Sequence, residues 1–372
     1  MKIVVINPIL YTSETANIKK VESIKDTMIY NLCLEIKRQG HEPILIAAED
    51  FKPKNIENYD FKIIFLKTRL HKIFKPNCFP LMKGLEKALK DECGKFDVII
   101  SSEVFMMSSL YASIRYKKST IIWHELAKHN NIMNKIPSKI WYNIISRLFF
   151  HNTRIVARSK NAQEFIRKYC NNVSENYIDH GVNLNEFTTS TKKENQFVVI
   201  SQLIYRKHID GIIKIFSKFI KKENESYKLI IIGSGEKLDE LKKVVKNEEI
   251  AENVVFEGQL KHDKMIPILS KSKALLINTE KDNSMLSIVE AIATATPIVT
   301  TDVPYNCDYI IKNKLGLVEK CWSEKELKEI VQNNELYVQN CLKYRNKVSN
   351  QYVIEQFVNE IKKLKSENKL TI

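Results

Sequence analysis

The sequence lacks any apolar run close to the roughly 18 residues that a membrane-spanning helix needs. Its first apolar stretch, Ile3 to Ile6, is too short for the apolar region of a signal peptide. The seven cysteines, an odd number scattered from Cys33 to Cys341, contain no C-x-x-C pair, which argues against a disulfide framework or a zinc site. These absences predict a cytosolic protein whose cysteines are small buried hydrophobes.

Internal repeats and low-complexity tracts are also absent from the chain. Hydrophobic residues make up 44% of the sequence and charged residues 28%, a composition typical of packed globular proteins and not of disordered ones. At 372 residues the chain is too long for one ordinary core, so the usual domain sizes predict two domains.

Positive charge is concentrated in one part of the chain. The formal net charge is +15, and residues 51–168 hold 23 Lys and Arg against 9 Asp and Glu, a net +14. A basic face of this kind suits an anionic partner: a lipid surface, a phosphate-linked polymer or a nucleic acid. Biased Lys, Ile and Asn usage is the alternative explanation.

Short β-rich runs alternate with amphipathic segments of helix length, a pattern typical of βαβ units and parallel sheets. One helix is predicted over Ser23 to Arg38 and ends before Gly40, a residue that tolerates the left-handed conformation. Strands of the first half are expected at Lys2 to Asn7, Glu42 to Ala47, Phe61 to Leu66, Asp97 to Ser101, Thr120 to Trp123 and Arg154 to Ala157.

A second, smaller series follows the polar stretch Thr188 to Gln196, which is the best linker candidate. Its strands are expected at Phe197 to Ser201, Lys228 to Ile232, Val254 to Glu257, Ala274 to Asn278 and Pro297 to Thr300. The tail from Ser323 to Leu370 is predicted to contain helices only.

The fold class predicted is therefore α/β, with two doubly wound domains facing each other across a cleft. Residues 1–188 are expected to form the first domain and residues 189–350 the second. C-terminal helices, with residues 351–372 as the last, are expected to return to the first domain.

Ligands of doubly wound sheets bind beyond the carboxyl ends of the strands, so the residues after each strand are the candidate site. Gly233-Ser234-Gly235 follows one strand, and its glycines would let the backbone approach a ligand closely. A purely structural βα connection explains the same residues equally well.

The stretch from Asp282 to Glu290 opens a predicted helix after the next candidate strand end. Ser284 is a plausible N-cap, and free amides of Met285 and Leu286 would suit an anion such as a diphosphate. Carboxylates accept hydrogen bonds from sugar and ribose hydroxyls. The alternative is a purely structural role, in which the segment is a capped helix with a solvated Glu290.

Together these stretches resemble the retaining, family-four type glycosyltransferases of the GT-B fold. Those enzymes carry an acidic residue, seven intervening residues and a Glu, followed by an Ala-rich helix, a small residue and Pro. The matching segments are Asp282 with the EAIATATPIV run at 290–299, HGVN at 180–183 with Phe187, SQL at 201–203 with Lys207, and GSG at 233–235.

The resemblance implies a role for each matching position. Lys207, helped by Arg206, would hold the donor diphosphate, and Glu290 would bind the ribose. Asp282 would contact the donor sugar, and His124, at a predicted strand end, would lie near the reacting sugar; a structural histidine is the alternative there. The remaining donor contacts are expected from Gln202, Gly233, Ser234, Asn283, Ser284, Met285 and Leu286.

Several positions depart from the family pattern, among them Gln202 and Asp282. Gln202 stands where an Arg usually assists the Lys, and Asp282 is one methylene shorter than the usual Glu. The acceptor is expected on the basic half, at Lys67 to Lys83 or at Ile136 to Phe150. The second segment suits either packing on the sheet or peripheral contact with an anionic membrane.

The function predicted is transfer of a sugar from a nucleotide donor, with UDP-sugars favoured, to a lipid-linked or polymeric cell-surface glycan. The resemblance implies that the configuration at the transferred sugar is retained. It also implies that the reaction needs no cofactor and no metal, and the sequence lacks a D-x-D metal motif. The cytoplasm, including the inner membrane face, is the expected location. The alternatives are a catalytically impaired relative that binds a glycan or a partner, and a nucleic-acid-binding protein, for which no recognised module is present.

Overall fold

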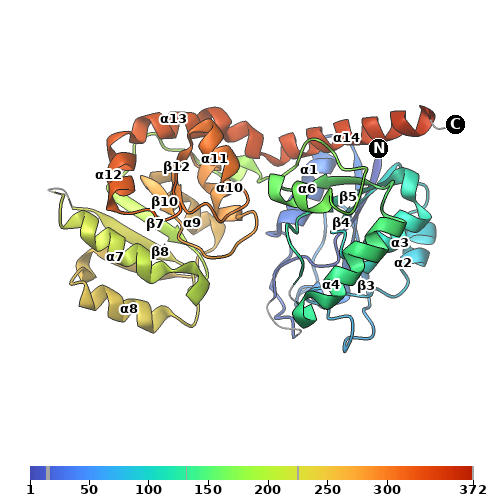
Figure 1. Cartoon of the computed structure of the whole chain (residues 1–372), viewed down its shortest axis with the longest axis horizontal. Coiled ribbons are helices and arrows are strands. Elements are labelled where there is room, and N and C mark those ends of the chain that lie inside the picture. Colours follow the sequence, from blue (N-terminus) through green and yellow to red (C-terminus); the bar gives the residue numbers. More distant parts are fainter. Residues whose placement is uncertain (14–16, 131, 224–225, 371–372) are drawn as a thin grey trace. The chain divides into compact units, whose positions relative to one another are not determined.

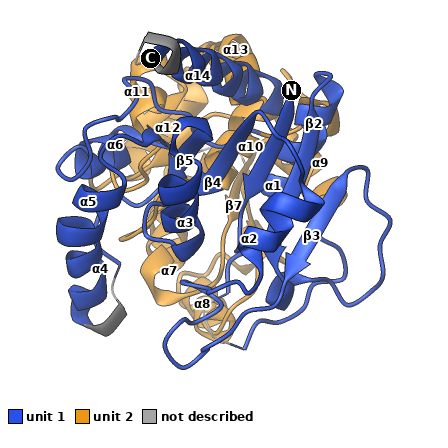
Figure 2. Cartoon of the chain, turned by 90° about the vertical axis from the view of Figure 1, so that its right-hand side faces the viewer, with its two compact units in different colours: residues 1–181, 350–372 blue, residues 182–349 orange. Residues whose placement is uncertain are grey.

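The computed structural model of the protein describes residues 1–13, 17–130, 132–223 and 226–370. The chain separates into two compact units (Figure 2): unit 1 comprises Met1–Gly181 and Asn350–Ile372, and unit 2 comprises Val182–Ser349. Each unit contains a six-stranded parallel sheet (Figure 1). The predicted fold class, two doubly wound α/β domains of the GT-B type, is confirmed at this level.

Unit 1 has the strand order β3-β2-β1-β4-β5-β6. The central strand is a run of β-branched residues, Ile3 to Ile6, that is buried throughout, as expected for a parallel sheet covered on both faces. The strands are β1 (Lys2–Ile6), β2 (Glu42–Ala48), β3 (Lys62–Leu66), β4 (Val98–Ser102), β5 (Thr120–His124) and β6 (Arg154–Ala157).

The helices of unit 1 follow its strands. The segment 136–149 is one continuous helix, α4 (Ile136–Ile140) and α5 (Arg147–Phe149) being joined by a π-helical turn over Trp141–Ser146. The other helices are α1 (Met28–Arg38), α2 (Leu85–Lys87), which continues as a π-helical turn over Ala88–Glu92, α3 (Met107–Arg115), α6 (Lys160–Ile166) and α14 (Asn350–Leu370).

Helix α14 belongs to unit 1 although it ends the chain (Figure 1). Its apolar side chains recur at helical spacing and join the core around the sheet; they are Val353, Ile354, Phe357, Ile361 and Leu364. Phe357 meets Trp123 of β5 edge to face, with 5.3 Å between ring centroids. Glu360, which is 2% exposed, accepts hydrogen bonds from Arg154 Nη2 at 2.8 Å and Nε at 3.0 Å.

Unit 2 has the order β12-β11-β10-β7-β8-β9. Its short edge strand β12 was not predicted, because it begins with a glycine and contributes only two apolar residues. With β12 the second sheet has as many strands as the first. Gly316 of β12 has φ 155°, and a Cβ there would lie 1.9 Å from Ile298 O. The strands are β7 (Gln196–Ile200), β8 (Lys228–Ile232), β9 (Val254–Gly258), β10 (Ala274–Leu276), β11 (Ile298–Thr300) and β12 (Gly316–Val318).

Helices cover both faces of the second sheet. Phe197 and Val199 of β7 join one buried cluster and Val198 joins the other, as the two-residue period of a strand requires. The helices are α7 (Ile209–Ile220), α8 (Leu238–Asn247), α9 (His262–Lys271), α10 (Leu286–Ala293), α11 (Asp308–Asn313), α12 (Glu324–Gln332) and α13 (Asn334–Tyr344). No helix in the described ranges is long and apolar enough to cross a bilayer.

Two predicted boundaries differ from the structure. Helix α1 begins at Met28 and not at Ser23, because Thr27 donates its amide and its hydroxyl to Ile24 O and closes a turn. Unit 2 begins at Val182 and not at residue 189. Val182 N–H donates to Val348 O, and Phe187 packs in the core of unit 2.

The Arg154–Glu360 pair gives the first test. Glu360→Ala leaves a nearly buried guanidinium without its main counter-charge, so we expect the free energy of unfolding of unit 1 to fall by about 3 kcal/mol. Urea denaturation followed by tryptophan fluorescence measures it. Glu367→Ala is the matched control: this exposed carboxylate lies 3.7 Å from Arg154 Nη1, and its loss should cost about 0.5 kcal/mol or less. Equal losses of unfolding free energy in the two variants would contradict the claim that Arg154 depends mainly on the buried Glu360.

Candidate active site

The strand order of unit 2 reverses between β7 and β10, and the loops that follow these two strands leave the same edge of the sheet. A crevice at such a reversal is the usual ligand site of doubly wound folds. The two loops are bonded together here, since Glu280 N–H donates to Arg206 O at 2.9 Å. They bring Lys207 and Asp282 into contact across 75 residues of sequence.

One carboxylate oxygen holds the cationic side chains of this site. Asp282 Oδ2 lies 2.5 Å from Lys207 Nζ and 3.3 Å from Arg206 Nη1, and it accepts a hydrogen bond from Thr279 Oγ1 at 2.8 Å. Lys207 is only 9% exposed. A nearly buried ammonium needs such a counter-charge, so the ion pair explains why Lys207 is tolerated there. The structure thus brings together three residues that the sequence assigned to one donor site.

The Gly233-Ser234-Gly235 loop lies against the loop after β7. A Cβ on Gly233, which has φ 141°, would lie 1.8 Å from Ser201 O, so only glycine fits. Leu203 N–H donates to Ser234 O at 3.0 Å. This contact gives Gly233 a structural reason, and its role in donor binding stays a prediction. The same contact places Gly233 and Ser234 beside exposed Gln202.

The start of α10 differs from the prediction. The helix begins at Leu286 with Met285 at its N-cap position, so Ser284 is not the cap, and its buried hydroxyl has no hydrogen-bond partner among the described residues. The Met285 amide is not free either, because it donates to Asn306 Oδ1 at 3.1 Å. Asn306 Nδ2 returns a bond to Met285 O at 2.9 Å. This buried amide clamps the loop that carries Asn283 and Ser284.

Glu290 lies in the second turn of α10 and is 3% exposed. Its Oε1 is 3.3 Å from Nε2 of half-exposed His262, at the start of α9. Burial raises the pKa of Glu290, and the nearby imidazole opposes this shift. The alternative interpretation, a solvated Glu290 carboxylate, is therefore wrong. A buried carboxylate with a perturbed pKa, near the carboxyl ends of the strands where ligands bind, is a functional candidate. The role of Glu290 as a ribose ligand stays a prediction.

In unit 1, His124 ends β5 with no exposed surface. Its ring stacks near Phe165, with 6.3 Å between centroids, and its Nδ1 lies 2.5 Å from Glu103 Oε1. Glu103 also accepts the amides of Glu125 and Leu126 at 3.1 and 3.2 Å. A sugar can reach His124 only if its covering residues move, so its catalytic role remains a prediction.

Glu103 holds an unusual conformation for these contacts. It has φ 66°, a left-handed backbone that is costly for a residue with a side chain. Burial alone would raise the pKa of Glu103, but His124, the Glu125 amide and the Arg158 charge outweigh burial and hold it below the usual range. Arg158 follows β6, pairs with Glu125 at 2.9 Å and lies 3.8 Å over the Trp123 ring.

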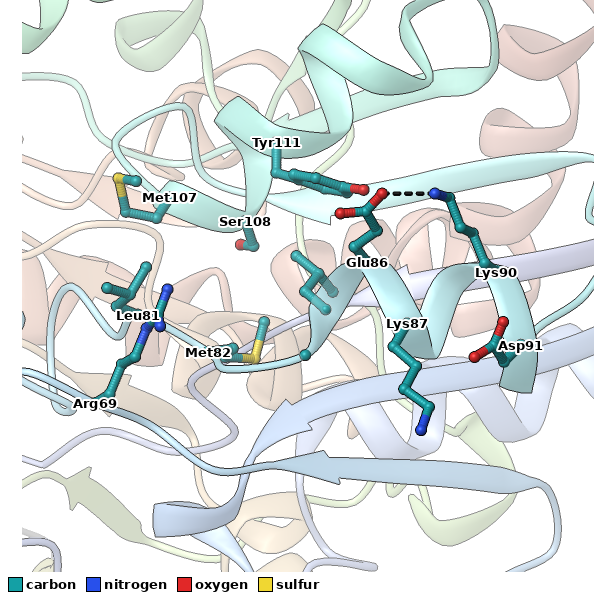
Figure 3. A pocket seen from close by; sticks show the side chains of 12 residues that line it. Arg69, Leu81, Met82, Glu86, Lys87, Lys90, Asp91, Met107, Ser108 and Tyr111 are labelled. Atoms are coloured by element: carbon teal, nitrogen blue, oxygen red, sulfur yellow. Dashed lines mark hydrogen bonds and ion pairs between the residues drawn. The ribbon is translucent and has the colours of Figure 1, made fainter.

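A pocket of about 600 Å³ lies in unit 1, between the loop after β3 and helices α2 and α3 (Figure 3). Arg69 stands at one end and the Glu86–Lys90 ion pair, at 2.6 Å, at the other. Ser108 and Tyr111 of α3 line it, and neither hydroxyl oxygen has a hydrogen-bond partner within the described chain. Its apolar lining comes from Leu81, Met82, Leu85 and Met107.

Sequence reasoning missed Asn306 and Glu103. Asn306 lies six residues after β11, and Glu103 directly follows β4, so the strand-end rule that selected Asp282 also applies to them. Their side chains act on backbone amides, a role that no residue type signals by itself. In the described ranges, no three or more His, Cys, Asp or Glu converge as metal ligands would.

Two sequence models of known families match the chain. Residues 26–186 match Glycosyltransferase Family 4, and residues 183–351 match Glycosyl transferases group 1. The two matches together cover the first sheet apart from β1, the whole second sheet and the candidate donor loops. The chain therefore belongs to the family-four glycosyltransferases of the GT-B fold.

Individual relatives are distant. Alpha-monoglucosyldiacylglycerol synthase of Streptococcus pneumoniae is 23% identical over 78% of this chain and 70% of its own. The GalNAc-alpha-(1->4)-GalNAc-alpha-(1->3)-diNAcBac-PP-undecaprenol alpha-1,4-N-acetyl-D-galactosaminyltransferase of Campylobacter jejuni is 25% identical over 86% of this chain and 88% of its own. Among solved structures, HepE of Anabaena in complex with UDP has a TM-score of 0.70 at 12% identity, over 98% of this chain and 100% of that one.

The buried Glu290 gives a pH-dependent prediction. Its pKa is raised in the folded state, so the folded protein binds this proton more tightly than the unfolded chain, and stability is lost as the pH rises through that range. Glu290→Gln removes the effect and should be more stable than the wild type at pH ~8, with the gain vanishing near pH ~4.

Thermal denaturation across this pH range measures the difference. Glu257→Gln, on an exposed position of β9, is the matched control and should track the wild type at every pH. A Glu290→Gln variant that is less stable than the wild type at high pH would mean that the His262 contact outweighs the cost of burial.

Proposed function

We propose that this glycosyltransferase moves a hexosyl or N-acetylhexosaminyl group from a nucleoside-diphosphate donor, with UDP-sugars favoured, to a hydroxyl of a lipid-linked or polymeric cell-surface glycan. Retention of configuration and independence of metal are parts of the proposal. The observation that carries it is the pair of cations, Lys207 and Arg206, gathered on one carboxylate at the strand reversal of unit 2.

A diphosphate offers these cations more negative charge than the single carboxylate of Asp282. Lys207 would turn to the phosphate oxygens, where its N–H groups stabilise the negative charge that grows as the bond from sugar C1 to the phosphate breaks. Asp282 would then be released to accept hydrogen bonds from sugar hydroxyls. In this proposal Lys207 and Asp282 pair with each other while no donor is bound.

Glu290 supports the other end of the donor. A buried carboxylate with an imidazole 3.3 Å away is suited to accept hydrogen bonds from the two ribose hydroxyls. The acceptor oxygen would form its bond to C1 on the face that the phosphate leaves, and the departing phosphate would take the acceptor proton. This reaction step needs no base from the protein and is compatible with retention of configuration.

The acceptor class is supported by what the relatives are named for. The Campylobacter jejuni enzyme is named for a glycan on PP-undecaprenol, and a further relative, from Staphylococcus aureus, is a poly(ribitol-phosphate) alpha-N-acetylglucosaminyltransferase, 28% identical over 32% of this chain. Both names include a phosphate-bearing molecule, a diphosphate-linked lipid in one and a polyol-phosphate polymer in the other. The net +14 of residues 51–168 is complementary to such acceptors.

Donor binding is tested by calorimetric titration with UDP, GDP and UDP-sugars. Lys207→Ala removes a charge-assisted hydrogen bond of the phosphate site, so we expect nucleotide affinity to fall by roughly 10- to 100-fold. Lys214→Ala, which removes an exposed cation of α7 that lies 3.8 Å from Asp210, should bind as the wild type does. Failure of every nucleotide to bind the wild type would favour the catalytically impaired, glycan- or partner-binding alternative.

The unit 1 pocket is the acceptor site that the proposal favours. Arg69 suits an acceptor phosphate, the unused hydroxyls of Ser108 and Tyr111 suit sugar hydroxyls, and the apolar lining suits the carbon face of a sugar ring or a lipid. Burial, together with the nearby Glu86 carboxylate, raises the pKa of Tyr111, so the phenol keeps its proton for donation.

Tyr111→Phe tests this placement. The loss of one hydrogen bond should raise the KM for the acceptor about fivefold and leave the nucleotide affinity unchanged. Tyr59→Phe, on the same unit but away from the pocket lining, is the control. Unchanged acceptor kinetics in Tyr111→Phe would contradict the assignment of this pocket as the acceptor site, without contradicting the donor site in unit 2.

A further inference from the structure

One imidazole stands beside the buried carboxylate that is proposed to hold the donor ribose. Glu290 is 3% exposed, and its Oε1 lies 3.3 Å from Nε2 of His262. In the part of the chain that the structure describes, no Lys or Arg forms an ion pair with Glu290. Because a buried carboxylate needs a hydrogen-bond or charge partner, His262 is the side chain on which the state of Glu290 depends.

The core of unit 2 fixes the position of the His262 ring. His262 is the first residue of α9, and its ring packs edge to face on Phe187, with 6.3 Å between ring centroids. Phe187 is buried in one of the two cores of unit 2. The imidazole does not cap α9, because Lys261 occupies the N-cap position and the described structure shows no side-chain hydrogen bond at this cap. The contact with Glu290 therefore has no explanation in α9 itself.

The His262–Glu290 contact lies at the ligand edge of the second sheet. Helix α9 begins shortly after the carboxyl end of β9, and α10, which carries Glu290, follows the loop after β10. The same loop carries Asp282, the ion-pair partner of Lys207. His262 is therefore on the same edge of unit 2 as the candidate phosphate site. Its side chain is 45% exposed, so the pair can be reached from solvent.

A carboxylate that binds two neighbouring hydroxyls must present acceptor oxygens to both of them. The terminal torsion of a glutamate side chain is broad, so Glu290 alone does not fix the plane of its carboxylate. An N–H of His262 that donates to Oε1 fixes this plane and leaves Oε2 and a second lone pair of Oε1 for ligand hydroxyls. Burial raises the pKa of Glu290 and His262 opposes this shift, so the imidazole also favours the ionised, acceptor-only form.

We propose that His262 is a positioning residue: it orients Glu290 toward the 2′- and 3′-hydroxyls of the donor ribose and so gives the site its preference for ribonucleotides over deoxyribonucleotides. The inference rests on the proposed function and adds a specificity-determining residue to its donor site. His262 acts through Glu290 and is not required to touch the nucleotide. A purely structural His262 would instead support the packing of α9 on Phe187 and would affect all nucleotides equally.

Calorimetric titration of the full chain with UDP and GDP, each compared with its 2′,3′-dideoxy form, tests the proposal. The wild type should bind the ribose form more tightly. His262→Ala should lower this affinity about fivefold and leave the affinity for the dideoxy form unchanged. His262→Gln, whose amide nitrogen can replace Nε2, should retain most of the preference. Glu290→Ala should lose the preference, and the addition of His262→Ala should then cost nothing further.

The matched control is His151→Ala, which removes an exposed imidazole from unit 1 and should bind as the wild type does. Thermal denaturation of each variant verifies that it is folded. If Glu290→Ala has lost the preference, a His262→Ala variant that keeps it, or that weakens both forms equally, would overturn the positioning role and leave the donor site intact. A wild type that binds neither nucleotide, or a Glu290→Ala variant that keeps the preference, would overturn the proposed ribose site and this inference with it.

Discussion

A nearly buried lysine must have a counter-charge, and in unit 2 this requirement links the two loops on which the candidate donor site depends. Lys207 follows β7 and Asp282 follows β10, and their ion pair spans the point where the strand order reverses. The Thr279 hydroxyl and the Arg206 guanidinium bind the same carboxylate oxygen, so the one carboxylate of Asp282 organises three other side chains. Under the proposed function, such a site is preorganised for the donor diphosphate, since Lys207 is already largely desolvated and both cations are directed to one place.

Most of the fold could be predicted from the chain alone. Buried β-branched runs such as Ile3 to Ile6 alternate with helical segments, and every strand with such a run was located to within two residues. Strand β12 was missed, because Gly316–Val318 holds only two apolar residues after a glycine that a close contact with β11 requires. The unit boundary was displaced by a few residues, because backbone pairing of Val182 with the segment before α14 is a tertiary event that no local composition signals.

The candidate site was predictable in its residues but less so in its contacts. Lys207, Arg206 and Asp282 meet as the strand-end rule requires. The Met285 amide, in contrast, is taken by Asn306, and His124 is enclosed by aromatic rings and by Glu103, because long-range side-chain contacts decide these arrangements. A close backbone contact explains the glycine of the Gly233 loop, whereas Glu290 is buried and not solvated.

The most direct test of the central claim, that a nucleotide sugar binds at the strand reversal of unit 2, is amide hydrogen exchange with and without saturating UDP-sugar. The account predicts slowed exchange in three segments of unit 2, namely 201–207, 233–235 and 282–290. Slowed exchange confined to other segments, with these three unchanged at saturation, would contradict it.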